Sequence, residues 1–155
     1  MKIRASTLTG WAGWAGWTTV LATVALLAFG AQPALADEDP LGTALRKAVS
    51  DNLAAYDRED VAGTLSTIDS DSPDYESTKD ALAAQFKDLD VTTSLVAFTL
   101  IGHDDEFAVA RVKVKTTGKA GSGFTDNTVD SIMVFHMQDG SWKLWGEEVL
   151  GVSLP

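Results

Sequence analysis

Residues 107–150 decide the fold, and they read FAVARVKVKTTGKAGSGFTDNTVDSIMVFHMQDGSWKLWGEEVL. Three β-rich runs in this stretch are separated by a Gly-rich loop and by the turn QDGS. Asp139-Gly140 between two such runs is typical of a two-residue hairpin, because glycine tolerates the positive φ of a type I′ turn. The stretch therefore predicts an antiparallel meander of three strands.

The two connections predict the register of the strands. Counting outward from Asp139-Gly140 gives the pairs Met137–Trp142, Phe135–Leu144 and Met133–Gly146. Centring the Gly-rich loop near Ala120 gives the pairs Val112–Val129, Ala110–Ser131 and Ala108–Met133, with Arg111 directly opposite Asp130.

Side chains alternate between the two faces of a strand, so this register divides the meander into two faces. The expected core face carries Ala108, Ala110, Val112, Val114, Val129, Ser131, Met133, Phe135, Met137, Trp142 and Leu144. The other face is mixed and carries Val109, Arg111, Lys113, Lys115, Asp130, Ile132, Val134, His136, Lys143, Trp145 and Glu147. A slip of one residue would bury three basic side chains, so the sequence specifies the faces well.

Upstream of the meander, apolar residues recur at helical spacing. They predict one helix from Leu41 to Tyr56, a short second helix after Asp60, and a third helix that Ser72 caps with Pro73 at its first position. The β-rich run 91–101 then leads into the meander. Three helices followed by about four strands indicate an α+β domain with the helices on one face of the sheet.

The N-terminus has the features of a secretory signal. Lys2 and Arg4 precede an apolar run at residues 20–29, and Ala34-Leu35-Ala36 is a small-x-small cleavage site. We expect residues 1–36 to be cleaved, residues 37–40 to form a short acidic tether, and residues 41–155 to form the domain, exported to the periplasm or the medium. The alternative is an uncleaved anchor, which Trp11, Trp14 and Trp17 would favour as interfacial aromatics.

Charge and composition exclude several classes of function. The chain has a formal net charge of −10, and loss of the leader with its two basic residues makes it −12. Such a chain repels nucleic acid and anionic membranes, so we expect neither as a partner. There is no Cys, and we expect no metal and no cofactor. His103 is expected in a solvated turn and His136 at the surface.

Two stretches carry a resemblance to a known family. Residues 54–61 (AAYDREDV) resemble the turn between the first two helices of the NTF2-like superfamily, also called SnoaL-like or steroid-isomerase-like. Residues 135–145 (FHMQDGSWKLW) are similar to its closing hairpin, where an acidic-Gly turn precedes a Trp-Lys-aliphatic strand. The resemblance covers residues 41–150. It implies a cone in which a curved sheet and the helices enclose an apolar pocket, and it implies frequent dimerisation through the outer sheet face.

No catalytic residue carries over from this resemblance. Steroid isomerases place a Tyr in the first helix, four residues before a helix-end position that matches Tyr56. Here that place is occupied by Asn52. The acidic pocket partners of the isomerases have no match either.

Two sets of residues are candidates for a site. A ligand pocket with aromatic walls and a few polar tips is expected from Tyr56, Tyr75, Phe86, Phe98, Ser131, Met133 and Trp142, and the alternative is that these residues only pack as core. A homodimer interface on the mixed face is expected from Val109, Arg111, Asp130, Ile132, Val134 and Trp145.

Three functions compete. The first is a non-catalytic exported module that binds a small apolar molecule or a protein partner, because the sequence holds no evident pair of a base and a nucleophile. The second is an isomerase or dehydratase that uses a pocket-lining acid or Tyr. The third is a structural dimer or immunity-like binder whose pocket is filled by its own side chains.

Overall fold

The computed structural model of the protein describes residues 39–155. The expected signal peptide lies outside the described residues, as do the first two residues of the expected tether. Asp39 is the N-cap of the first helix and Pro40 is its first residue, one residue before the predicted start at Leu41. None of the helices in the described part is long and apolar enough to cross a membrane.

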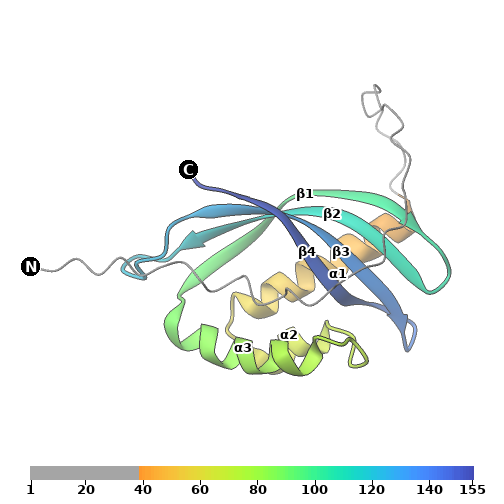
Figure 1. Cartoon of the computed structure of the whole chain (residues 1–155), viewed down its shortest axis with the longest axis horizontal. Coiled ribbons are helices and arrows are strands. Elements are labelled where there is room, and N and C mark those ends of the chain that lie inside the picture. The colour runs from red at the N-terminus through yellow and green to blue at the C-terminus, as the bar shows by residue number, and fades with distance from the viewer. Residues whose placement is uncertain (1–38) are drawn as a thin grey trace, which may run out of the picture. The chain divides into compact units, whose positions relative to one another are not determined.

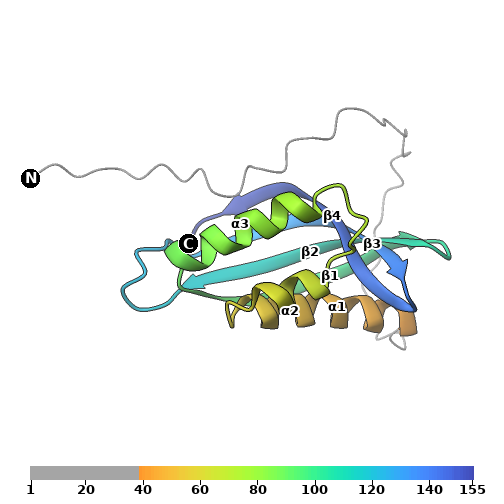
Figure 2. The same cartoon turned by 90° about the horizontal axis from the view of Figure 1, so that it is seen from below.

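Three helices precede four strands, as the sequence predicts (Figure 1). The elements are α1 (Pro40–Tyr56), α2 (Val61–Ser66), α3 (Tyr75–Asp88), β1 (Val91–His103), β2 (Phe107–Gly118), β3 (Asn127–Gln138) and β4 (Ser141–Ser153). The strands form one antiparallel sheet in the order β1-β2-β3-β4. The sheet is curved and the three helices lie on one side of it, which gives the predicted α+β cone (Figure 2).

The third helix begins at Tyr75, two residues later than the sequence predicts. Its N-cap is Asp74, whose side chain makes no capping hydrogen bond. The hydroxyl of Ser72, the expected cap, accepts from the backbone N–H of Asp74 at 3.3 Å and donates to the backbone carbonyl of Trp145 at 2.7 Å. Ser72 therefore fastens the α2–α3 loop to β4.

The hairpin between β3 and β4 has the predicted turn. Asp139 and Gly140 both have positive φ, 52° and 78°, which is the requirement of a type I′ turn. The predicted pairs Met137–Trp142 and Phe135–Leu144 are present. The β2–β3 register is shifted by two residues from the prediction, so Ala110 lies opposite Met133 and Arg111 opposite Ile132. Because the shift is even, every side chain of β2 and β3 keeps its predicted face.

Two bulges in β4 were not predicted. Leu144 lies opposite Phe135 and Gly146 opposite Val134, so Trp145 is an extra residue. Leu150 is a second extra residue, between Val149 and Gly151. The first bulge reverses the alternation, so Glu147 lies opposite Met133 rather than on the mixed face.

The core lies between the helices and the face of the sheet that they cover, which we call the inner face. The main core joins Leu45 and Val49 of α1 to inner-face residues that are almost fully buried, namely Ala108, Ala110, Val112, Val114, Met133 and Phe135. A second core joins α2, the α2–α3 loop and α3 through Leu65, Ile68 and Leu82. The opposite side of the sheet, the outer face, is only partly buried.

Candidate functional site

The predicted pocket residues fall into two groups rather than one. Tyr56, Tyr75 and Phe86 pack against the second core. Met133 belongs to the main core, and Phe98 and Trp142 pack against it. The side chain of Leu144 packs against both cores. Whether these residues contact a ligand stays a prediction.

Tyr56 brings a hydroxyl group to the second core. Its ring meets Phe86 edge to face with centroids 5.0 Å apart, and its hydroxyl donates to Gln85 Oε1 at 3.3 Å. Burial, and then the charge of Asp57, raise the pKa of the Tyr56 hydroxyl. Tyr56 is therefore a neutral hydrogen-bonding group within a largely apolar environment.

The inner face carries one acid that sequence reasoning placed on the outer face. Glu147 lies opposite Met133 and is partly buried. Burial raises the pKa of the Glu147 carboxyl, and the nearby Ser131 hydroxyl lowers this pKa by a smaller amount. Ser131 is 1% exposed, and its Oγ makes no hydrogen bond of normal geometry within the described residues. An acid and an unpaired hydroxyl thus share one apolar surface, where polar groups are costly to leave without partners.

A shallow groove of about 460 Å³ lies at the other end of the inner side. Its walls come from α1, from the end of α2 and from the β3–β4 hairpin, and its residues are Ala44, Lys47, Ala48, Asp51, Ser66, Thr67, Gly140, Ser141, Trp142 and Lys143. Trp142 is the single predicted pocket residue in this groove. Lys47 forms an ion pair with Asp51, and Lys143 donates to the carbonyl of Ser66. Both lysines of the groove therefore already have a partner within the protein.

The predicted interface residues lie together on the outer face. Arg111 and Asp130 are diagonal neighbours rather than directly opposite, and they form a bidentate pair at 2.8 and 2.6 Å. Lys113, which does lie opposite Asp130, is 3.3 Å from the same carboxylate. The hydrogen bond from Arg111 lowers the pKa of Asp130 to about 2. Val109, Ile132, Val134 and Trp145 are partly exposed around this charged group.

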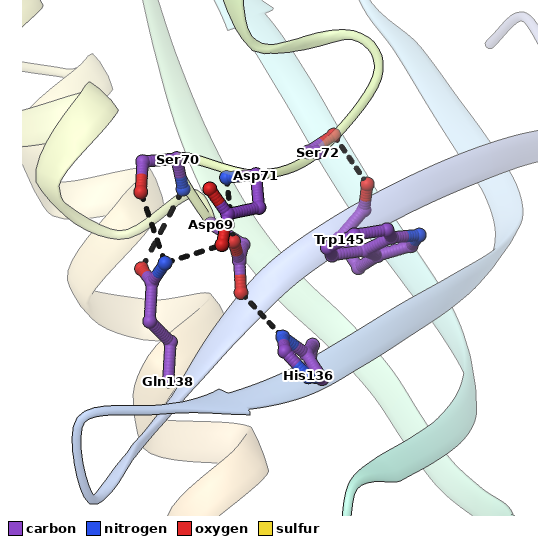
Figure 3. Close-up of polar contacts among 7 residues, drawn as sticks. All are labelled: Asp69, Ser70, Asp71, Ser72, His136, Gln138 and Trp145. Atoms are coloured by element: carbon purple, nitrogen blue, oxygen red, sulfur yellow. Dashed lines mark hydrogen bonds and ion pairs between the residues drawn. The ribbon is translucent and has the colours of Figure 1, made fainter.

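In the described chain, a network of side-chain hydrogen bonds is centred on Asp69, in the α2–α3 loop (Figure 3). Asp69 is fully buried. Its Oδ2 accepts from His136 Nδ1 at 2.6 Å, and its Oδ1 accepts from Gln138 Nε2 at 3.0 Å and from the backbone N–H of Asp71 at 2.8 Å. His136 is thus held by a buried carboxylate and is not the simple surface side chain that we expected.

Backbone contacts hold the same loop against the sheet. The N–H of Asp69 donates to the carbonyl of Leu144, and the N–H of Leu144 donates to the carbonyl of Thr67, both at 2.9 Å. The His136 ring stacks on Phe107 at 4.6 Å and meets Trp145 edge to face at 5.1 Å. The loop is therefore anchored to β3 and β4 by backbone, ionic and aromatic contacts.

This pair lacks the further groups that acyl-transfer catalysis needs. A carboxylate that accepts from Nδ1 orients an imidazole and leaves Nε2 free to take a proton. Within residues 39–155, no serine or threonine hydroxyl is hydrogen-bonded to His136, so the pair has no nucleophile to activate. The geometry favours an anchoring role for Asp69 and His136.

The described part of the chain contains no group of three or more His, Cys, Asp or Glu side chains that could hold a metal ion. The metal-free and cofactor-free site that the sequence predicts stays a prediction. His103, at the end of β1, is exposed, and its Nδ1 lies 3.4 Å from the carbonyl of Asp104.

Sequence reasoning missed two residues of interest. Glu147 was placed on the wrong face because a β-bulge has no clear signal in a run such as WKLWGEEVL. Asp69 lies in a loop between two helices, and its partner His136 is 67 residues away. The one hint was the β-like spacing that sets His136 and Gln138 on one face of their strand.

A family model matches residues 47–154 of the chain, and its description is "Anti-sigma-I factor RsgI9, C-terminal domain". Among curated proteins, none matches the chain significantly.

Solved structures share the fold at low sequence identity. A putative scytalone dehydratase from Novosphingobium aromaticivorans has a TM-score of 0.60 and 12% identity, over 73% of this chain and 86% of that one. A ketosteroid isomerase-like protein from Erwinia carotovora has a TM-score of 0.56 and 15% identity, over 73% and 98%. An NTF2-like protein from Cytophaga hutchinsonii has a TM-score of 0.57 and 16% identity, over 68% and 93%. These similarities show that the chain has the fold of NTF2-like proteins.

Proposed function

The chain belongs to the family described as the C-terminal domain of anti-sigma-I factor RsgI9, and from that premise we propose that it is a non-catalytic binding module. It holds a small, largely apolar molecule against the inner face of its sheet. The family description names a regulatory factor and not an enzyme, which supports a role in binding rather than in turnover.

One observation carries this proposal: the inner face combines an apolar surface with a buried hydroxyl, Ser131, and a partly buried carboxyl, Glu147. Within residues 39–155, Ser131 Oγ makes no hydrogen bond of normal geometry, and the Glu147 carboxyl lies close to it. Val149, which lies opposite Ser131, is 38% exposed. An apolar surface with a few convergent polar groups is the usual composition of a small-molecule site.

The test is a ligand screen on the purified protein. Thermal unfolding is followed against a broad library of small apolar molecules, and native mass spectrometry is used to detect molecules that copurify. We expect at least one ligand class to raise the melting temperature, and the replacement of Met133 by a charged residue to abolish the shift. The absence of any shift and of any copurified molecule would reject the proposal.

The same proposal includes export and dimerisation. The signal-like features of residues 1–36 support export, and mass spectrometry of the exported protein is expected to find Asp37 as the first residue. The partly exposed apolar side chains of Val109, Ile132 and Val134 support a homodimer through the outer face. Dimerisation would leave the inner face available to a ligand.

A second candidate is an isomerase or dehydratase, and the raised pKa of Glu147 favours it. A carboxyl whose pKa is raised by burial is suited to general acid–base catalysis. Under this alternative, Glu147→Gln abolishes turnover of an added ketone or alcohol substrate without loss of its binding. Under the leading proposal, the purified protein releases every ligand chemically unchanged.

A further inference from the structure

Glu147 is the one charged residue that the register places on the inner face of β2, β3 and β4. The other residues of these strands on that face are apolar or carry an uncharged polar group. The bulge at Trp145 is the reason that Glu147 faces inward. No basic side chain of residues 39–155 forms an ion pair with it, although six other carboxylates in this part pair with Lys, Arg or His.

In the part of the chain that the structure describes, no cation offsets the charge of this carboxyl. Burial disfavours its ionised form, which the raised pKa reflects. The hydroxyl of Ser131 offers partial compensation, but it has no hydrogen bond of normal geometry. A positively charged group with several N–H donors would offset the charge of Glu147 and give Ser131 Oγ a donor at the same time.

The surroundings of Glu147 are apolar. Met133 lies directly opposite, and Val149 and Val152 follow on the same face of β4. Val149 is 38% exposed and Val152 is 56% exposed, so both retain surface that a ligand could cover. Covering exposed apolar surface is favourable by about 25 cal/mol per Å².

We propose that this site selects amphiphilic cations, with an ammonium or guanidinium head at Glu147 and Ser131 and an apolar skeleton along Val149 and Val152. This inference rests on the proposed function and names its ligand class. Anions are disfavoured by Glu147 and by the net charge of −10. Neutral molecules can cover the apolar surface, but they leave the carboxylate charge uncompensated.

The experiment compares three probes of equal chain length that differ only in the head group. Octylammonium, octanol and octanoate are titrated into the full chain, expressed with its own leader, and binding is measured by calorimetry below the micellar concentration of each probe. We expect octylammonium to bind at least about tenfold more tightly than octanol, which is the contribution of a hydrogen bond to a charged group. Octanoate is expected to bind most weakly.

Two variants distinguish a specific contact at Glu147 from a general attraction of cations to a negatively charged protein. Glu147→Gln is expected to bind octylammonium and octanol equally. Glu148→Gln removes the same charge from the adjacent residue, which is exposed and lies opposite Ile132 on the outer face, and it is expected to keep the tenfold preference. An equal loss of preference in both variants would overturn the inference.

The outcomes also distinguish this inference from the proposed function. If octanol binds as tightly as octylammonium to the unmodified protein, the cation preference is wrong and the binding module stands. If none of the three probes binds and the ligand screen is also negative, both proposals are rejected.

Discussion

At the scale of single residues, Asp69 is the position on which the most contacts converge. Its carboxylate accepts hydrogen bonds from His136, Gln138 and the N–H of Asp71, and it has no exposed surface. A buried acceptor of this kind stabilises a fold chiefly because its removal leaves several donors without partners.

Replacement of Asp69 by Asn is therefore expected to destabilise the protein by about 3 kcal/mol. The amide has a single acceptor oxygen, so His136 Nδ1–H and Gln138 Nε2–H cannot both keep their partner. Urea unfolding at neutral pH measures the change. The control is Asp71→Asn, at an exposed side chain in the same loop, which is expected to change stability by less than about 0.5 kcal/mol. Equal effects of the two substitutions would contradict the anchoring role of Asp69.

Glu147 gives a prediction about pH. Burial raises the pKa of its carboxyl above the ordinary value of 4.5, so the folded state binds a proton more readily than the unfolded state. This contribution to stability is complete below pH 4.5 and is lost as the pH rises through the pKa of the folded state. Glu147→Gln cannot ionise, so we expect it to be more stable than the unmodified protein at neutral pH and equally stable near pH 4.

The measurement is the free energy of unfolding in urea across this pH range. Glu148→Gln, at an exposed carboxylate, serves as the control and is expected to follow the unmodified protein at every pH. A Glu147→Gln variant that is less stable than the unmodified protein at neutral pH would mean that the folded state satisfies the charged carboxylate.

Neither of these two residues could be identified from the sequence, and the reasons differ. The contact between Asp69 and His136 depends on how a loop returns to the sheet, which has no local signature. The orientation of Glu147 depends on one extra residue at Trp145, and a strand with alternating side chains gives no indication of where the alternation breaks. The small residues Ala108, Ala110 and Ser131, in contrast, follow the alternation and were placed correctly on the inner face.

At the scale of elements, the β3–β4 hairpin depends on the backbone conformation of Gly140. Its φ of 78° lies in the region that L side chains rarely adopt. We expect Gly140→Ala to destabilise the protein by about 1–2 kcal/mol, because a Cβ is strained in this conformation.

Thermal or urea unfolding measures this effect, with Gly102→Ala as the matched control. Gly102 lies in β1, and its position has open space around an added Cβ and no positive φ, so its substitution is expected to change stability little. If the two substitutions cost the same, the turn conformation does not contribute to stability as argued here.

The elements themselves were largely predictable. Helical spacing located α1 and α2, and the Asp139-Gly140 turn set two of the pairs in the last hairpin correctly. The loop between β2 and β3 was centred too early, and the resulting shift of two residues left both faces intact. The predicted start of α3 was two residues too early: Ser72 Oγ accepts from the N–H of Asp74 and donates to β4, but the helix itself begins at Tyr75.

At the scale of the whole molecule, the outer face leads to a prediction about assembly. If two chains associate through it, Ile132→Lys places a charge among the apolar side chains of the interface and is expected to convert the dimer to a monomer. Analytical ultracentrifugation at tens of micromolar measures the mass. Val96→Lys, at an exposed apolar residue of β1 outside the proposed interface, is expected to remain dimeric. A monomer mass for the unmodified protein would exclude this interface.

The fold of the molecule was more predictable than its site. An α+β cone follows from the order of elements and from side-chain alternation, and both are properties of short stretches. The inner-face acid follows from a bulge, and the grouping of the predicted aromatic residues into two cores follows from the way α3 packs against α2. Such features depend on contacts between distant parts of the chain.

The bulges in β4 have a consequence for changes in the length of the chain. Loss of one residue from a regular strand reverses the orientation of every side chain that follows it. Trp145 and Leu150 are already supernumerary relative to β3. Deletion of Trp145 would remove the first bulge and leave Glu147 on the inner face, and deletion of Leu150 would remove the second and leave Val152 on that face. At either of these two positions in β4, a natural variant could lose one residue without reversing which face the later side chains of the strand occupy.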